Sequence, residues 1–189
     1  MCIRDRYLSK IAKTKRDLYK GKVIGITGSA GKTTLKETLA FFLKKDHTIS
    51  YSKKSYNNHL GVLISLLNLN LKSNFAIFEI GTNNFGEIKF LSNLVKPSEV
   101  FITNIQSTHL ENFQTKNNIA REKADIFISK YNDNRKKLYL NVSSKSENIL
   151  ITKAKKEKNI KIIRIDNSSK KYFIKKISPY KKLHKVTSV

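Results

Sequence analysis

A glycine-rich stretch, Gly25-Ile26-Thr27-Gly28-Ser29-Ala30-Gly31-Lys32-Thr33-Thr34, lies between a short apolar run and a segment with helical periodicity. Glycines allow a tight turn whose N–H groups face inward, and the start of the following helix adds the positive end of its dipole. In such a loop Lys32 would reach the β- and γ-phosphates of a nucleotide, and the Thr33 hydroxyl would bind Mg²⁺. The general pattern has a glycine where this chain has Ile26, so the motif is a shortened one. Its strand–loop–helix context favours a phosphate-binding loop over a glycine-rich surface turn, with residues Thr27 to Thr34 surrounding the phosphates.

The rest of the chain alternates apolar strands with amphipathic helices. This alternation predicts an α/β fold with a doubly wound, mainly parallel sheet. Strands are expected at 22–27, 47–51, 75–80, 99–105, 137–142, 160–165 and 171–177. Helices are expected within 1–21, 31–45 and 117–131, near 144–158, and in apolar segments ending near 69 and 95. In the helix over 31–45, the periodic apolar side chains expected to pack on the sheet are Leu35, Leu39, Phe42 and Leu43.

Two polar residues are placed where strands of this sheet would end. Glu79 lies near the carboxyl end of an apolar strand, and ligands of parallel sheets bind just beyond those ends. It would therefore face the loop that ends at Thr33, and we expect it to hold Mg²⁺ directly or through water rather than to be an exposed edge glutamate. His109 also follows a strand, so it is a candidate ligand at the same edge, although a lone histidine is more often structural.

Three further residues stand out from their local context. Asn57 and Asn58 precede an apolar helix, where one asparagine would suffice as a cap, so the second is a candidate ligand-binding residue. Lys123 lies among apolar neighbours on the helix predicted over 117–131, which is an unexpected place for a surface lysine.

The net charge of +24 raises the question of a nucleic-acid-binding protein. Residues 1–21 carry +5, residues 22–134 carry +5 and residues 135–189 carry +14, so the part that holds the motifs is nearly ordinary. The 38 basic residues comprise 32 Lys and 6 Arg, whereas base readout and bidentate phosphate contacts favour Arg. We therefore expect no specific nucleic-acid partner. No segment has the apolar length of a membrane span or signal peptide, and the single cysteine fits a reducing compartment, so we expect a cytoplasmic monomer without a membrane partner.

Five blocks of sequence, taken together and in order, resemble the central domain of the Mur ligases. The blocks are Thr27–Thr34, Tyr56–Val62, Phe78–Ile88, Ile102–Ile105 with His109–Phe113, and Ala120–Phe127. Such an ordered set across residues 23–130 is far more specific than any single block, and beyond residue 142 the match is loose. Within the family, the blocks are most similar to the branch that joins D-alanyl-D-alanine to UDP-MurNAc-tripeptide.

The resemblance implies an ATP-dependent amide-bond ligase of peptidoglycan-precursor synthesis that also uses Mg²⁺. In that reaction the substrate carboxylate takes the γ-phosphoryl group of ATP, and the amine of D-alanyl-D-alanine then attacks the acyl phosphate. Phosphoryl transfer depends mostly on positioning and on neutralising negative charge, which explains why the motifs contain a phosphate loop, lysine and a carboxylate.

The resemblance also implies a role for individual residues. It places Lys32 on the phosphates, Thr33 and Glu79 on Mg²⁺, and His109 near a second metal ion. Lys123 matches the lysine that many family members carbamylate, a change that would turn a buried cation into an anion able to approach Mg²⁺.

Asparagines complete the set of residues carried over from the resemblance. Asn57 and Asn58 would lie near the γ-phosphate and the substrate carboxylate. Asn141 matches an asparagine that contacts adenine, although Val142-Ser143-Ser144 stands where acidic residues usually follow it.

The chain departs from the family in its extent. Mur ligases have an amino-terminal domain that holds the UDP-sugar and a carboxyl-terminal domain that closes over ATP. We expect residues 1–21 to be a lead-in segment, whose opening Met-Cys-Ile-Arg-Asp-Arg fits no pattern, and residues 22–189 to be a truncated central domain. Such a fragment would bind ATP and Mg²⁺ weakly and would not ligate alone.

Other functions stay open from the sequence. A folylpolyglutamate synthase-like ligase would share the fold and the acyl-phosphate chemistry. An unrelated P-loop NTPase or kinase would explain Lys32, Thr33 and Glu79. It would leave four residues as coincidences: Asn57, Asn58, His109 and Lys123. A basic nucleic-acid-binding module is favoured only by the charge.

Overall fold

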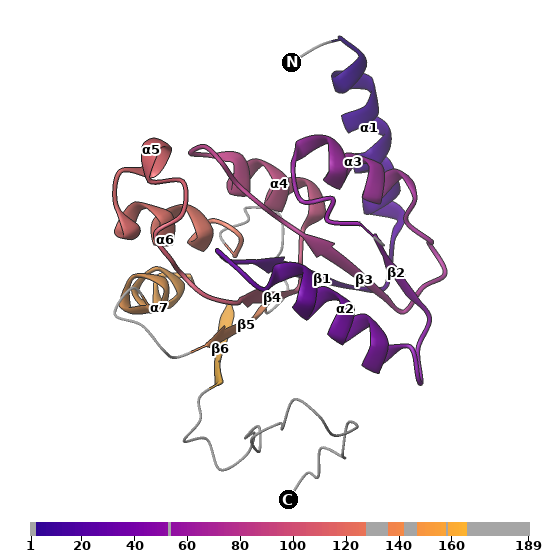
Figure 1. Ribbon diagram of the computed structural model, residues 1–189. Helices are drawn as coiled ribbons and strands as arrows, with labels where there is room; N and C mark the ends of the chain where they lie inside the picture. Colours follow the sequence, from indigo (N-terminus) through magenta and orange to yellow (C-terminus); the bar gives the residue numbers. More distant parts are fainter. Residues whose placement is uncertain (1–2, 53, 128–135, 142–146, 158, 166–189) are drawn as a thin grey trace, which may run out of the picture.

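One parallel sheet organises the part of the chain that the structure describes (Figure 1). The computed structural model describes residues 3–52, 54–127, 136–141, 147–157 and 159–165. The strands are β1 (Lys22–Thr27), β2 (Ile49–Tyr51), β3 (Phe75–Glu79), β4 (Glu99–Ile102), β5 (Lys136–Asn141) and β6 (Ile160–Ile165). All pairs are parallel, in the order β2-β3-β1-β4-β5-β6. The predicted α/β class and parallel sheet are thereby confirmed.

Helices cover both faces of this sheet. They are α1 (Ile3–Leu18), α2 (Lys32–Leu43), α3 (His59–Leu67), α4 (Glu87–Val95), α5 (Leu110–Phe113), α6 (Lys116–Ala124) and α7 (Glu147–Lys155). Helix α2 lies on one side of the sheet, and α1, α3 and α4 lie on the other, where α1 contacts both α3 and α4 (Figure 1). Helices on both faces make the sheet doubly wound, because a parallel sheet must be covered on each side.

The alternation of side chains along β1 explains why both faces need cover. Ile24 and Ile26 point to the side of α2, where they pack with Ala40 and Ile77. Val23 belongs to the larger core on the other face. Because successive side chains of a strand point to opposite faces, a strand buried on both sides is apolar nearly throughout.

The strand register brings the carboxyl ends of the central strands to one edge. Ile26 of β1 lies beside Glu79 of β3, and Thr27 lies beside Ile102 of β4. The loop that follows β1 therefore starts next to Glu79 on one side and next to the segment after β4 on the other.

Several predicted boundaries differ from the observed ones. The strand predicted over 99–105 ends at Ile102, because the backbone of the next residues bonds to the phosphate loop instead of continuing the ladder. The helix predicted over 117–131 runs only to Ala124 and ends in a turn, and its positions 128–131 lie outside the described residues. The strand predicted at 171–177 also lies outside them.

One predicted core residue of α2 was wrong. Leu35, Leu39 and Leu43 pack against the sheet, but Phe42 is 42% exposed. The fully buried positions of α2 are Lys36 and Ala40. Successive residues of a helix are about 100° apart, so a face centred on these positions turns Phe42 away from the sheet.

The predicted amphipathic helix in the lead-in segment is α1, and its basic residues bind the ends of other helices. Arg16 donates from Nη2 to the carbonyl of Lys96 at 2.8 Å, just beyond the end of α4. Lys15 donates to the carbonyl of Leu67, the last residue of α3. Positive groups are favourable at these negative helix ends, so part of the basic charge of the segment serves the fold.

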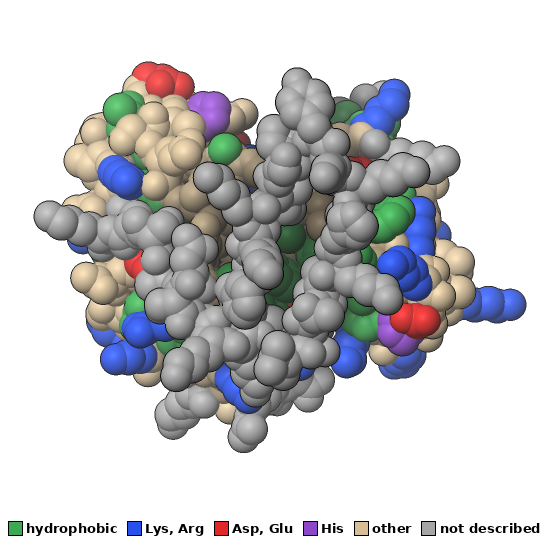
Figure 2. Space-filling model, turned by 60° about the horizontal axis from the view of Figure 1, so that its bottom comes forward, with side chains coloured by type: hydrophobic (Ala, Val, Ile, Leu, Met, Phe, Trp, Pro, Cys, Tyr) green, Lys and Arg blue, Asp and Glu red, His purple; other side chains and the backbone are tan. Residues whose placement is uncertain are grey.

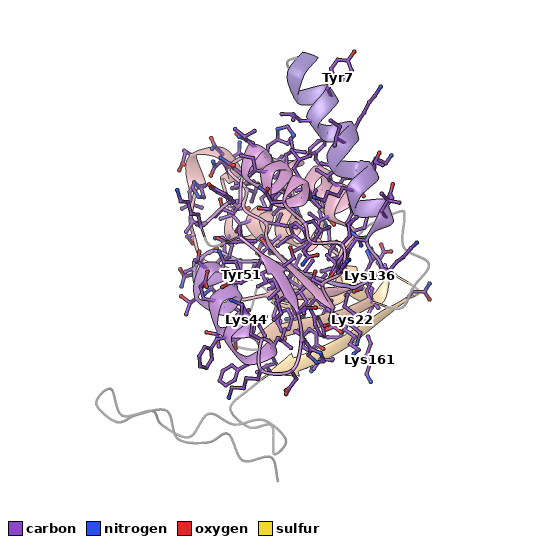
Figure 3. All side chains as sticks on the ribbon, turned by 90° about the vertical axis from the view of Figure 1, so that its right-hand side faces the viewer. Tyr7, Lys22, Lys44, Tyr51, Lys136 and Lys161 are labelled. Carbon is purple, nitrogen blue, oxygen red and sulfur yellow. The ribbon has the colours of Figure 1, made fainter. Side chains whose placement is uncertain are left out.

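Other lysines lie at the amino ends of strands. Lys22, Lys136 and Lys161 lie close to one another in Figure 3, at the end of the sheet opposite the phosphate loop. On the face shown in Figure 2, the described Lys and Arg side chains are dispersed rather than gathered into one patch. Within the described residues, no helix has the length and apolar character needed to cross a bilayer.

Candidate functional site

The loop between β1 and α2 owes its shape to two glycines. Gly28 is buried with a φ of 148°, and a Cβ built on it would lie 1.8 Å from Oγ1 of Thr103. Gly31 adopts a φ of 78° as the residue before α2, and a Cβ there would meet nothing within 4 Å. Because Gly31 has no side chain to cap α2, N–H groups of the first turn can receive an anion.

The segment after β4 braces this loop. Asn104 accepts hydrogen bonds from the N–H of Ser29 at 3.1 Å through its carbonyl, and from the N–H of Ala30 at 2.9 Å through its side chain. Thr103 donates from its hydroxyl to the carbonyl of Ala30 at 2.6 Å. Gln106 adds a backbone hydrogen bond to Oγ of Ser29 at 2.9 Å. Sequence reasoning missed Asn104 as a residue that shapes the phosphate loop.

Thr27 and Thr34 mark the two ends of the predicted binding stretch. Thr27 is fully buried at the end of β1, and its backbone carbonyl accepts from the N–H of Thr103 at 3.0 Å. Thr34 is exposed in the first turn of α2. Thr34 is therefore open to solvent, whereas Thr27 contributes to the base of the loop.

Two lysines from different helices converge on one carbonyl of the loop. Lys32 of α2 donates from Nζ to the oxygen of Gly28 at 3.0 Å, and Lys123 of α6 donates to the same oxygen at 3.2 Å. Burial, and to a lesser extent the charge of Lys32, lower the pKa of Lys123 to about 8, against the opposing effect of the neighbouring Glu122. Burial also lowers the pKa of Lys32, against the attraction of Glu79.

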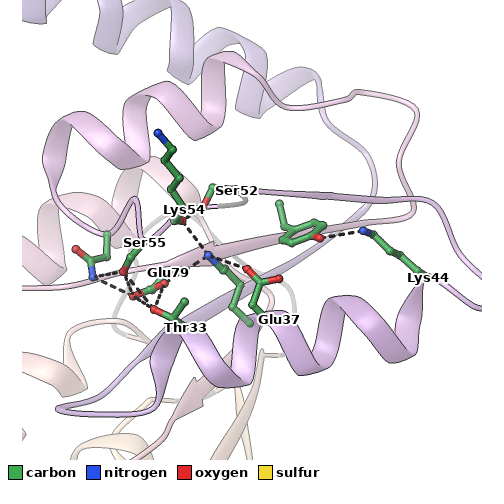
Figure 4. A network of polar contacts seen from close by, with 10 residues as sticks. Thr33, Glu37, Lys44, Ser52, Lys54, Ser55 and Glu79 are labelled. Carbon is green, nitrogen blue, oxygen red and sulfur yellow. Dashed lines mark hydrogen bonds and ion pairs between the residues drawn. The ribbon is translucent and has the colours of Figure 1, made fainter.

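Glu79 lies beside the start of α2, with its carboxylate fully engaged (Figure 4). Thr33 donates to its oxygens at 3.0 and 3.1 Å, Ser55 donates at 2.9 Å, and the side-chain amide of Asn57 donates at 2.9 Å. The residue is only 2% exposed. Thr33, Ser55 and Glu79 thus offer adjacent oxygen donors, the ligand type that Mg²⁺ prefers.

Lys36 lies behind this carboxylate and was not singled out from the sequence. Within the described residues it is the largest side chain with no exposed surface, and Nζ donates to the carbonyl of Lys54 at 2.9 Å. Nζ also lies 3.7 Å from Oε2 of Glu79 and 3.4 Å from Oε1 of Glu37. A helical signal was available, because Lys36 follows Thr33 by three residues and so shares its face of α2.

The two asparagines before α3 take different places. Asn58 is the cap of α3, where its side-chain oxygen accepts from the N–H of Gly61 at 2.8 Å. Asn57 reaches Glu79 instead. Both line a cleft of about 710 Å³ whose other wall is the segment Gly81–Glu87. One asparagine is therefore used as a cap, and the other is part of the carboxylate network.

Glu122 holds the far wall of that cleft, and it too was missed. Its buried carboxylate accepts from the N–H of Gly86 at 2.9 Å and from the N–H of Ile88 at 2.9 Å, at the start of α4. Consecutive residues of α6 therefore fasten two different parts of the site, Glu122 the cleft wall and Lys123 the phosphate loop. The negative charge is favourable at the amino end of a helix.

His109 and Asn141 are placed at the same edge of the sheet but outside the Glu79 network. His109 precedes α5 with a φ of 55°, and its Nδ1 lies 3.7 Å from a carboxylate oxygen of Glu111. Within the described residues, no recorded hydrogen bond or ion pair joins it to Glu79 or Lys123. Asn141 lines a second cleft, of about 120 Å³, together with Asn104.

The donor set fits a magnesium ion bound together with phosphate. The described residues contain no group of three or more His, Cys, Asp or Glu side chains that could hold a metal ion alone. Mg²⁺ is usually held by one or two carboxylates, with waters and substrate phosphates completing its coordination. Glu79 with the hydroxyls of Thr33 and Ser55 meets this requirement beside a phosphate loop.

Comparison with known sequences relates the chain to one family. The family model for the Mur ligase middle domain matches residues 26–189. The UDP-N-acetylmuramoyl-tripeptide--D-alanyl-D-alanine ligase of Rickettsia prowazekii is 43% identical over 120 residues, which are 64% of this chain and 27% of that protein. The chain thus spans about a quarter of the length of the curated relatives it matches.

Solved structures show the same similarity. MurF from Acinetobacter baumannii superposes with a TM-score of 0.78 and 29% identity over 85% of this chain and 34% of that one. The MurF ligase from Thermotoga maritima in complex with ADP gives 0.76 and 25% identity over 91% of this chain and 39% of that one. Mycobacterium tuberculosis folylpolyglutamate synthase, at 0.66 and 13% identity over 85% of this chain and 45% of that one, shares the fold alone.

Proposed function

Because the chain belongs to the Mur ligase family, whose middle-domain model matches residues 26–189, we propose that it binds ATP with Mg²⁺ as the nucleotide-binding part of an amide-bond ligase. The observation that carries this proposal is the contact of Thr33 with both oxygens of Glu79 at 3.0 and 3.1 Å, directly after the phosphate loop. A hydroxyl at the start of the helix and a carboxylate beside it are protein ligands of the kind that a nucleotide-bound Mg²⁺ uses.

Positive charge in the site has a matching task. Lys32 and Lys123 both reach the carbonyl of Gly28, so both ammonium groups lie against the loop that would surround the phosphates. Mg²⁺, when bound, neutralises phosphate charge during transfer. Lys32 orients the phosphates and adds to that neutralisation, whereas Lys123 has a positive charge to offer only as the unmodified amine.

The remaining predicted residues receive proposed roles at the rim. Asn57 and Asn58 line the cleft of about 710 Å³, where they would orient a substrate carboxylate near the γ-phosphate. Asn141 would contact adenine from the cleft that it shares with Asn104. His109 would lie near a second metal ion, and Lys123 would act in its carbamylated form.

We assign the whole ligase the reaction that its relatives' name describes, the joining of D-alanyl-D-alanine to UDP-MurNAc-tripeptide in the cytoplasm. A carboxylate oxygen of the tripeptide attacks the γ-phosphorus, ADP leaves, the amine of D-alanyl-D-alanine attacks the acyl carbon, and phosphate leaves. The similarity to relatives at 43% identity favours this substrate over folate, since the folate enzyme shares only 13%. The 189-residue chain would bind nucleotide but form no amide product.

A titration of the chain with ATP in the presence of Mg²⁺ tests the proposal. We expect saturable binding that is lost in Lys32→Ala and retained in Lys45→Ala, which removes the same charge from the opposite end of the helix region. Binding that survives in Lys32→Ala would contradict the assignment of the phosphate loop. Amide product formed by the chain from UDP-MurNAc-tripeptide and D-alanyl-D-alanine would contradict its proposed inactivity.

A further inference from the structure

We propose that Lys36 is a positioning residue that holds the magnesium-binding carboxylate of Glu79 in place, an inference that rests on the proposed function. Lys36 lies one turn after Thr33 on α2, and its side chain has no exposed surface. A lysine that is fully removed from water is costly to the fold unless its charge is paired. Its burial therefore calls for partners that fix its position.

Those partners come from three places in the fold (Figure 4). Nζ of Lys36 donates to the carbonyl of Lys54 at 2.9 Å and lies 3.7 Å from Oε2 of Glu79. Glu37, whose side chain is 45% exposed, approaches Nζ from the solvent side at 3.4 Å. One ammonium group thus links α2, the end of β3 and the segment that carries Ser55.

The division of contacts on Glu79 shows what Lys36 does. Ser55 and Asn57 both donate to Oε1, whereas the recorded contacts of Oε2 are with Thr33 and Lys36. An ion taken up by Thr33 and Glu79 would replace the hydrogen bond between them. Lys36 would then be the remaining partner of Oε2, so it fixes the orientation of the carboxylate toward the ion.

The contact with Lys54 extends this effect to a second oxygen donor. Lys54 immediately precedes Ser55, whose hydroxyl lies 2.9 Å from Glu79 and 3.2 Å from the hydroxyl of Thr33. By holding the carbonyl of Lys54, Lys36 also holds Ser55 within reach of the carboxylate. A single buried cation therefore positions two of the three oxygen-bearing side chains that face the proposed metal.

The experiment separates metal binding from nucleotide binding. The 189-residue chain, Lys36→Met and Lys44→Met are titrated with ATP by calorimetry at a series of Mg²⁺ concentrations and in EDTA. Lys44→Met is the matched control, because Lys44 follows α2, is bonded to Tyr51 at 2.9 Å, and carries the same charge outside the site. Thermal unfolding of each variant without ligand reports any general loss of structure.

We expect Lys36→Met to raise the half-saturating Mg²⁺ concentration about 10–100-fold, the usual effect of removing a group that orients a metal ligand. Its ATP affinity in EDTA and the behaviour of Lys44→Met should stay unchanged. If Lys36→Met does not fold, Lys36→Arg carries the test, because it keeps the charge but cannot place it at the same point. The same rise in the Mg²⁺ requirement is then expected.

Two results would overturn the inference about Lys36 and leave the proposed function standing. One is an unchanged Mg²⁺ requirement in the Lys36 variant, and the other is an equal loss of ATP affinity with and without Mg²⁺, which indicates a merely structural role. A different result, the absence of any Mg²⁺-dependent ATP binding by the unaltered chain, would overturn the proposed function and this inference together.

Discussion

Replacing Lys123 by Met should flatten the dependence of stability on pH. Burial lowers the pKa of Lys123 to about 8 from the ordinary 10.5, and the positive charge of Lys32 contributes to the lowering. The folded chain therefore releases this proton before the unfolded chain does. Since the unfolded state then binds more protons, the free energy of unfolding rises with pH between these two values. Methionine cannot titrate, so the variant loses this contribution.

The size of the effect follows from the two pKa values. From pH 7 to pH 9.5, one lysine shifted in this way adds about 2 kcal/mol to the free energy of unfolding. Lys136, whose pKa burial also lowers to about 8, adds a similar rise, but it is present in both proteins and cancels in the comparison. The difference between the two pH profiles therefore reports Lys123.

Urea unfolding followed by circular dichroism measures these profiles. Buffers are freed of CO₂, because CO₂ reacts with a neutral amine to give a carbamate and would remove the titration. We expect the rise in Lys123→Met to be about 2 kcal/mol smaller than in the unaltered chain. The control Lys89→Met, at an exposed position of α4, should follow the unaltered chain. Equal rises in the unaltered chain and Lys123→Met would refute the reasoning.

Three substitutions test the framework of the site by urea unfolding. Gly28→Ala would place its Cβ 1.8 Å from the Thr103 hydroxyl and should cost at least about 1–3 kcal/mol, the usual cost of overpacking. Gly31→Ala, also at positive φ but with nothing within 4 Å, should cost less, and the opposite order would contradict the packing argument. Glu122→Ala leaves two N–H groups at the start of α4 without their carboxylate. It should lower the free energy of unfolding by about 1.5–3 kcal/mol, the usual contribution of a hydrogen bond to a charged group. No loss of stability would show that solvent replaces the carboxylate.

The pairing of Thr33 with Glu79 could be anticipated because it follows from topology alone. In a parallel sheet all strands end at one edge, so a carboxylate at a strand end and a loop after a neighbouring strand must approach each other. The strand register pairs Ile26 with Glu79, and this sets the position of the loop relative to the carboxylate to within one residue. The prediction needed only the class of the sheet and the positions of the two motifs.

Lys36, Asn104 and Glu122 escaped prediction for a common reason. Each acts on a partner in another element, Lys36 on the carbonyl of Lys54, Asn104 on the phosphate loop and Glu122 on the start of α4. A lysine on a helix or an asparagine in a loop has the same local pattern whether it faces solvent or a distant backbone group. Their roles depend on how elements cross, which a reading of one segment at a time does not contain.

The charge of the site is better explained by its ligand than by the net charge of the chain. Lys36 is paired with Glu79, whereas Lys32 and Lys123 share one neutral carbonyl, so positive charge is in excess at the phosphate loop. Burial lowers the pKa of both lysines, and for Lys123 the charge of Lys32 lowers it further. While Lys123 is an unmodified amine, a bound polyphosphate would relieve this repulsion, since an opposite charge nearby favours the protonated amine. The same excess that is unfavourable in the ligand-free fold therefore favours binding of an anion, and it arises from two lysines rather than from the basic carboxyl-terminal third of the sequence.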